Sequence, residues 1–120
     1  MSYELTFWRQ HPGVTIEPQS IYERLCEGER VEGLEDLPIE EIVTRIAETF
    51  VNGWERIDAS NWEGSEGSFQ VSTTPQFFRI DCYGLEGEVM NRFIDIGTEF
   101  GTCLYDPQTG VRFDPTGGTS

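Results

Sequence analysis

The chain contains no lysine, and this absence excludes two kinds of chemistry. A Schiff base forms on a lysine amine, and a P-loop holds its phosphates with a lysine, so neither is available here. Histidine is nearly absent as well, since His11 is the only one and lies beside Pro12 in a segment that breaks regular structure. A single histidine does not make a His-rich metal site, and no motif supplies the third group that Ser–His or Cys–His catalysis requires. The sequence therefore predicts neither an enzyme nor a metal site.

Long apolar runs and a disulfide pattern are also missing. No apolar run approaches the ~18 residues of a membrane span, and no basic flank precedes an apolar stretch at the N-terminus. Cys26, Cys82 and Cys103 are odd in number and widely spaced among apolar neighbours. That pattern is typical of reduced thiols in a core and not of a disulfide framework. We therefore expect a cytoplasmic protein.

Negative charge is what the sequence has in excess. There are 22 acidic side chains and eight arginines, which give a formal net charge of -14 on 120 residues. Such a charge repels phosphate backbones and anionic bilayers, so we expect no nucleic-acid ligand, no membrane ligand and no anionic cofactor. The sequence also lacks the spaced Asp ligands of an EF-hand, so it predicts no calcium site of that kind. We therefore expect no cofactor. The expected partner is a cationic surface, above all that of another protein.

The apolar periodicity predicts a single α+β domain at residues 1–113 and a flexible C-terminal tail at 114–120. The stretch 52–67, rich in Gly, Ser, Asn and Glu, is expected to be a loop or an irregular strand. The other predicted elements are, in order, a strand at 2–8, a helix from 18 that stops at 28, a helix at 39–50, a strand hairpin at 69–72 and 78–83, a helix at 89–100 and a strand at 103–105.

This order of elements favours a ferredoxin-like sandwich, in which a four-stranded antiparallel sheet has its helices packed on one face. The apolar residues of each alternating strand would face the helices, and the polar ones would form the opposite face. The first set contains Leu5, Phe7, Val71, Ile80, Cys82 and Leu104. The second contains Glu4, Thr6, Trp8, Gln70, Ser72, Arg79, Asp81 and Tyr83.

Acidic residues and tryptophans coincide in the segment 17–66. It carries 14 acidic residues against four arginines, a net charge of -10, and is expected to form one acidic pole. Aromatic side chains set among charges are typical of binding hot spots. The predicted partner-binding residues are therefore Trp54, Trp62, Glu55, Asp58, Glu63, Glu40, Glu41 and Trp8. The alternative is that Trp54 and Trp62 cap the edges of a small core while the acids keep the protein soluble.

Four stretches carry a resemblance to a known group of proteins: MSYELTFW at 1–8, FQV at 69–71, IDCYG at 80–84 and LYDPQ at 104–108. They resemble small stand-alone bacterial immunity proteins, the partners of toxins from contact-dependent inhibition, Rhs and type VI secretion systems. The resemblance covers the strands better than the helices and assigns no site residues. It implies a cytoplasmic protein that binds one cognate toxin tightly and blocks its active site or an essential surface.

The leading hypothesis is therefore an immunity-type inhibitor of a basic protein toxin. A nuclease fits this role, because an acidic inhibitor matches the potential of a cleft that binds phosphates. Two alternatives stay open: a nucleic-acid-mimicking inhibitor of a DNA-binding protein, and a small ligand-binding ferredoxin-like domain that uses Trp8, Arg79, Asp81 and Tyr83. The sequence leaves the oligomeric state and the binding face undetermined.

Overall fold

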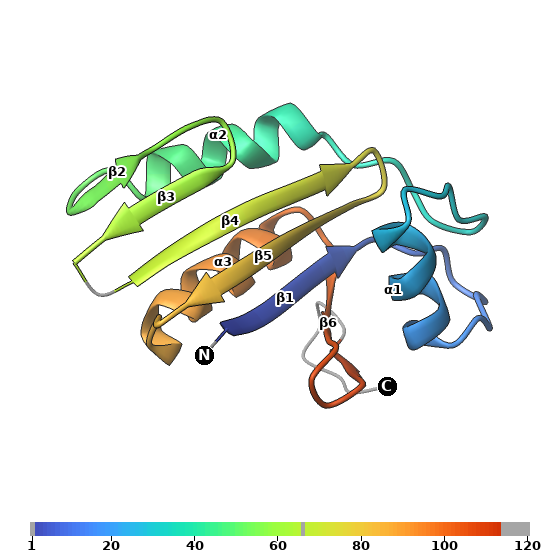
Figure 1. Ribbon diagram of the computed structural model, residues 1–120. Helices are drawn as coiled ribbons and strands as arrows, with labels where there is room; N and C mark the ends of the chain where they lie inside the picture. Colours follow the sequence, from blue (N-terminus) through green and yellow to red (C-terminus); the bar gives the residue numbers. More distant parts are fainter. Residues whose placement is uncertain (1, 66, 114–120) are drawn as a thin grey trace.

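A computed structural model describes residues 2–65 and 67–113, so the tail predicted at 114–120 lies outside the described residues. These residues form three helices and one large sheet, arranged as in Figure 1. All the predicted helices and strands are present, and three further strands occur. In chain order the elements are β1 (Ser2–Trp8), α1 (Pro18–Cys26), α2 (Ile39–Thr49), β2 (Trp54–Arg56), β3 (Asn61–Gly64), β4 (Gly67–Thr74), β5 (Phe77–Tyr83), α3 (Gly87–Glu99), β6 (Cys103–Asp106) and β7 (Val111–Phe113).

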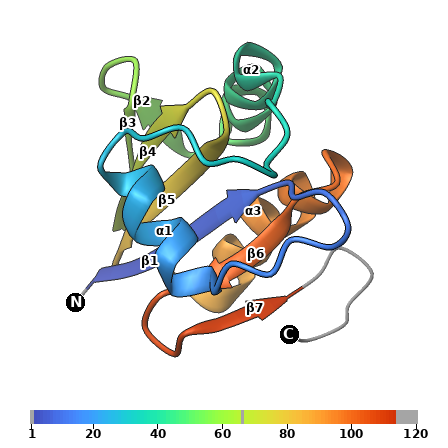
Figure 2. The same ribbon diagram turned by 90° about the vertical axis from the view of Figure 1, so that its right-hand side faces the viewer.

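The sheet has seven strands in the order β2-β3-β4-β5-β1-β6-β7, and all its strand pairs are antiparallel. In Figure 2, β2 and β3 lie at one edge and β7 at the other. The predicted four-stranded ferredoxin-like sandwich is therefore wrong. The polar stretch after α2 extends the sheet because Trp62 lies directly opposite Phe69 and buries its ring there. At the other edge, a turn held by the Asp106 carboxylate, which accepts a bond from the Gln108 N–H, leads the chain back as β7.

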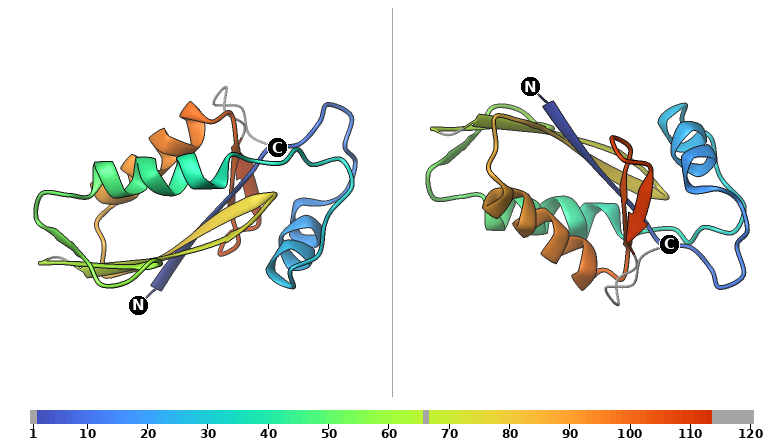
Figure 3. Two further views of the ribbon diagram at one scale, coloured as in Figure 1. Left: turned by 90° about the horizontal axis from the view of Figure 1, so that it is seen from above. Right: turned by 90° about the horizontal axis from the view of Figure 1, so that it is seen from below.

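The helices lie on both faces of the sheet, which also departs from the prediction. Figure 3 shows α2 and α3 on one face and α1 on the other. Helix α1 buries Ile21 and Leu25 in a cluster with Trp8, Phe77 and Tyr105, side chains that point away from α2 and α3. These apolar side chains lie at one end of the predicted polar face. Helix α1 packs over them because removing apolar surface from water is favourable.

The main core lies between the sheet and the pair α2 and α3. The predicted inward set from β1, β4 and β5 is confirmed, because Leu5, Phe7, Val71, Ile80 and Cys82 are all buried there. Phe69 is the centre of an aromatic cluster in this core. Its ring centroid lies 4.9 Å from Phe50, 5.3 Å from Trp54, 5.1 Å from Trp62 and 4.8 Å from Phe93.

Gly97 of α3 lies in tight contact with Phe7 of β1, and it gives a first prediction. A Cβ atom at Gly97 would lie 2.5 Å from the Phe7 ring and 2.9 Å from Thr102 Oγ1. Gly97→Ala should therefore lower the free energy of unfolding by about 1–3 kcal/mol, although alanine favours the helix. Urea denaturation measures this change. Gly87→Ala, at the first residue of α3 with open space around it, is the matched control and should cost nothing. Equal losses in the two variants would contradict the packing explanation.

Candidate functional site

Part of one sheet face has no helix over it. Because α1 covers only the end where β1 finishes, the rest of that face is uncovered, as Figure 1 shows from the front. The alternation of each strand assigns the residues that point outward there. We call this surface the open face and define it by Glu4, Glu55, Glu63, Ser68, Gln70, Asp81 and Tyr83.

Strand register arranges these residues in two rows across the sheet. In the first row Glu55 lies opposite Glu63, Glu63 opposite Ser68, and Ser68 opposite Tyr83. The Tyr83 side chain is exposed, at 45% of its possible area, so an aromatic ring lies beside the carboxylates.

The second row adds two carboxylates to the open face. Gln70 lies opposite Asp81, and Asp81 lies opposite Glu4. With the first row, the open face therefore carries four carboxylates beside one aromatic ring, and one of them, Asp81, is ion-paired with Arg79.

Glu55 and Glu63 form a like-charge pair directly across the β2–β3 hairpin. Both side chains are exposed, and no ion pair among the described residues includes either of them. Like charges in opposite positions destabilise a strand pair by a few tenths of a kcal/mol or more. The hairpin retains this unfavourable pair on a surface that a cationic partner can reach.

Polar contacts with α1 and β5 border the open face. The Arg79 guanidinium lies 3.2 Å from the Asp81 carboxylate and donates a hydrogen bond to Cys26 Sγ at 3.4 Å. The Tyr22 hydroxyl donates a hydrogen bond to the Glu4 carboxylate. Burial and this hydrogen bond raise the pKa of Tyr22, so its hydroxyl keeps the proton at neutral pH. Arg79 therefore neutralises Asp81, whereas Glu55 and Glu63 have no ion-pair partner among the described residues.

The tryptophans that the sequence placed in a partner-binding site belong to the interior. Trp8 is fully buried under α1, and Trp62 is 1% exposed and stacks on Phe69. Trp54 is half-buried, with its ring 5.4 Å from Phe50. Trp8 and Trp62 are therefore not available as surface anchors, because their rings complete the two cores. The alternative interpretation, in which Trp54 and Trp62 belong to the edge of a core, describes their positions.

The predicted acidic residues do not form one patch. Glu40 and Glu41 are exposed on α2, on the opposite side of the sheet from Glu55 and Glu63. The expected single acidic pole at 17–66 is therefore wrong, because α1 and α2 of that segment lie on opposite faces (Figure 3).

Asp58 has a local structural role in the β2–β3 turn. Its Oδ1 atom accepts hydrogen bonds from the Ser60 N–H at 2.8 Å and from Asn61 Nδ2 at 2.9 Å. The Ser60 hydrogen bond is the main reason why the pKa of Asp58 is lowered. Asp58 is exposed at the end of the hairpin and keeps its negative charge while it holds the turn.

Two of the three cysteines are buried as predicted. Cys82 lies in the main core, where burial raises its pKa to about 12, and Cys103 lies under α1. The third departs from the prediction, because Cys26 is exposed at the last residue of α1. No group of three metal-ligating side chains occurs within the described ranges.

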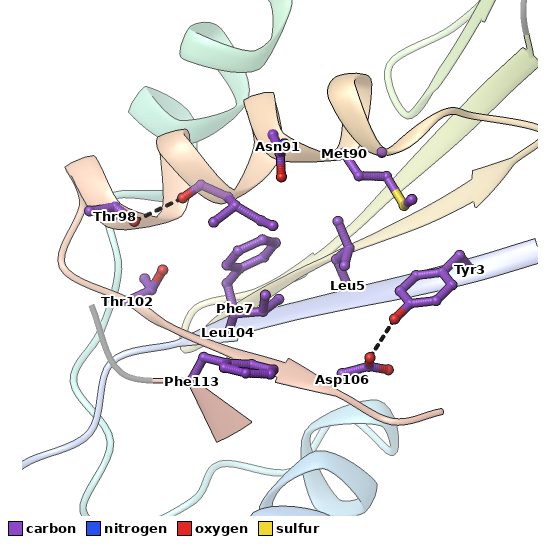
Figure 4. A pocket seen from close by; sticks show the side chains of 12 residues that line it. Tyr3, Leu5, Phe7, Met90, Asn91, Thr98, Thr102, Leu104, Asp106 and Phe113 are labelled. Carbon is purple, nitrogen blue, oxygen red and sulfur yellow. Dashed lines mark hydrogen bonds between the residues drawn. The ribbon is translucent and has the colours of Figure 1, made fainter. Parts of the chain in front are cut away.

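A cavity of about 550 Å³ lies on the other side of the sheet from the open face, between α3 and the strands β1, β6 and β7 (Figure 4). Most of its wall is apolar and comes from Leu5, Phe7, Met90, Ile94, Leu104 and Phe113. Sequence reasoning did not find this cavity. The alternation of β1 predicted that these side chains point toward the helices, but it does not predict how closely α3 approaches them.

Tyr3 and Asp106 make the cavity polar at one end. The Tyr3 hydroxyl donates a hydrogen bond to the Asp106 carboxylate, and this contact is the main reason why the pKa of Tyr3 rises to about 12. Asp106 is 7% exposed, and no ion pair among the described residues includes it. Its burial opposes ionisation, but hydrogen bonds from Tyr3 and Gln108 outweigh this effect and lower its pKa. Asp106 is therefore a buried carboxylate that stays charged.

Comparisons with models of known families, with curated proteins and with solved structures give no match for this chain. No helix in the described part of the chain is long and apolar enough to cross a membrane. Function is therefore inferred from the open face and the cavity.

Proposed function

We propose that this protein is an immunity-type inhibitor that acts in the cytoplasm and binds a basic protein toxin through its open face. The observation that carries the proposal is the uncovered part of one sheet face, where Glu4, Glu55 and Glu63 lie on the same surface as the exposed ring of Tyr83. Acidic side chains around an aromatic residue suit a cationic protein surface, since the charges speed the encounter and the ring supplies contact area.

The distribution of arginines supports the same choice of partner. Five arginines form ion pairs within the protein: Arg9 with Glu35, Arg24 with Glu29, Arg30 with Asp36, Arg45 with Glu99 and Arg79 with Asp81. None of these pairs includes Glu4, Glu55 or Glu63, so these five arginines leave the three carboxylates without an ion pair. A nuclease would suit this surface, because its phosphate-binding cleft carries the opposite charge. The resemblance of the strand segments to bacterial immunity proteins agrees with this role.

The proposal is tested with the product of a neighbouring gene. We expect immobilised protein to retain one basic protein encoded beside its own gene through a high-salt wash, and co-expression to suppress the toxicity of that protein. Failure to retain such a protein, with this chain folded, would contradict the proposal. A retained DNA-binding protein that DNA displaces would instead support nucleic-acid mimicry.

A double charge reversal tests whether the open face makes the contact. Glu55→Arg/Glu63→Arg should slow association with the captured toxin about ten-fold or more at low salt, because attraction on the approach path becomes repulsion. Surface plasmon resonance at several salt concentrations measures the rate. The hairpin should keep its stability, because the variant again has two like charges in opposite positions.

The matched control is Glu40→Arg/Glu41→Arg on α2, which changes the net charge by the same amount on the other side of the sheet. It should change the association rate by less than about three-fold, since screening weakens the effect of charges more than ~10 Å away. Equal slowing in both variants would show that the net charge matters and the open face does not.

A further inference from the structure

The cavity beside α3 combines an apolar space with a buried charge. Figure 4 shows Leu5, Phe7 and Leu104 on the strand side and Met90 on the helix side. Its volume of about 550 Å³ falls within the range of roughly 300–1,000 Å³ that small-molecule sites occupy. An apolar wall with a few converging polar groups is the usual composition of such a site.

The charge at the polar end restricts which molecules fit. Asp106 lies at the cavity wall as a carboxylate that is more than nine-tenths buried, and no arginine of the described residues forms an ion pair with it. Buried charges in proteins are normally paired. A fatty acid or another anion would instead place its charge beside this carboxylate, in a protein whose net charge is -14.

We propose that the cavity binds a small amphiphile whose apolar body fills the space beneath α3 and whose cationic head, an ammonium or guanidinium group, lies against Asp106. The head would form a charge-assisted hydrogen bond with the carboxylate, which already accepts hydrogen bonds from the Tyr3 hydroxyl and from the backbone and side-chain N–H groups of Gln108 but has no ion-pair partner among the described residues. The apolar body would contact Leu5, Phe7, Met90 and Leu104 and remove them from water.

This site is independent of the proposed inhibitor function. The cavity uses the residues of β1 that point toward α3, such as Leu5, whereas the open face uses the alternate residues, such as Glu4. The charge reversal Glu55→Arg/Glu63→Arg should therefore leave ligand binding unchanged. Conversely, a cavity that binds nothing would leave the proposed toxin contact intact.

Three probes of similar size and different head groups test the proposal: 2-phenylethylammonium, 2-phenylethanol and 3-phenylpropanoate. NMR titration of the full chain at neutral pH should give saturable shifts at residues that line the cavity. The ammonium should bind at least about five-fold more tightly than the alcohol, and the carboxylate should bind most weakly. Equal affinities for the ammonium and the alcohol, a preference for the carboxylate, or no saturable binding would each overturn the proposal.

Two variants test whether the probes bind in the cavity and whether Asp106 causes the preference for the ammonium. Asp106→Asn should reduce the ratio of ammonium to alcohol affinity to about one, whereas Asp95→Asn, an equal change on the exposed surface of α3, should keep the wild-type ratio. Ile94→Trp should abolish binding of all three probes by filling the space. Circular dichroism shows whether Asp106→Asn is folded. If this variant is unfolded, the order of the three probe affinities for the wild-type protein and the loss of probe binding in Ile94→Trp still test the proposal. Unchanged binding in Ile94→Trp would overturn the site.

Discussion

Replacing Phe69 by alanine is expected to lower the free energy of unfolding by about 3–5 kcal/mol. Phe69 is 1% exposed and contacts four other aromatic rings, which come from the residue after α2, the strands β2 and β3, and α3. Its removal would leave a space bordered by rigid rings, which cannot close around it without losing their own contacts. Since a domain of this size is stable by only about 5–15 kcal/mol, the variant should be close to unfolding at 37 °C.

Urea denaturation followed by tryptophan fluorescence measures this loss, because Trp54 and Trp62 both contact Phe69. Phe113→Ala is the matched control, since it makes the same substitution at a ring that is 38% exposed at the end of β7. It should cost about 1 kcal/mol or less. Similar losses in the two variants would contradict the central place of Phe69 in the core.

The aromatic cluster also decides which variants can test binding. Trp62→Ala would remove a ring stacked on Phe69, so its loss of toxin binding would report loss of fold and not loss of a contact. The residues of the open face do not share this problem. Glu55, Glu63 and Tyr83 are exposed, and their replacement leaves both cores complete. Binding experiments are therefore informative on the open face.

Regular elements of this protein are predictable from sequence because their burial pattern has a clear period. In β1, Leu5 and Phe7 face the main core while Glu4 and Thr6 point the other way, so the alternation is visible in the sequence. In α2, Ile42 and Ile46 lie one turn apart and are both buried. Each of these two elements packs a single apolar side against a core, and the spacing of its apolar residues shows that side in the sequence.

The edge strands are not predictable in the same way. β2 has three residues and β3 has four, which is too short for an alternation to be distinguished from a loop. Trp62 is buried because the register places it opposite Phe69, and that register is a property of the assembled sheet. The polar residues around Trp54 and Trp62 favoured an exposed site in the sequence, whereas their rings are part of the core.

The candidate sites depend even more on tertiary structure. The Tyr3–Asp106 contact joins residues 103 positions apart, and the cavity requires β1 to lie beside β6 and β7 beneath α3. The polar face of the central strands was predicted correctly, but which part of it stays open depends on the position of α1. That position is set where the chain passes from one face of the sheet to the other, and the buried side chain of Gln76 bonds this connection to the sheet.

Gln76 lies in the β4–β5 turn and is 2% exposed. Its side chain accepts a hydrogen bond from the Val31 N–H at 2.7 Å and donates to the Val31 carbonyl at 3.0 Å and the Leu34 carbonyl at 3.2 Å. Three residues further on, the Leu37 N–H donates to the Pro75 carbonyl at 2.8 Å. Val31 and Leu34 belong to the core under α1, whereas Leu37 belongs to the core under α2. The chain therefore crosses the end of the sheet while it is bonded to this turn.

Gln76→Ala should lower the free energy of unfolding by about 3 kcal/mol or more. It leaves three backbone groups of the connection without their partner, and each buried unsatisfied group costs roughly 1–3 kcal/mol. The same variant should loosen α1, so hydrogen exchange at Ile21 and Leu25 should become faster than at Ile42 and Ile46 in α2. Gln70→Ala, a glutamine on the open face, is the matched control and should change stability by less than about 0.5 kcal/mol. Equal acceleration of exchange in α1 and α2 would show that Gln76 stabilises the whole domain and does not specifically hold α1 in place.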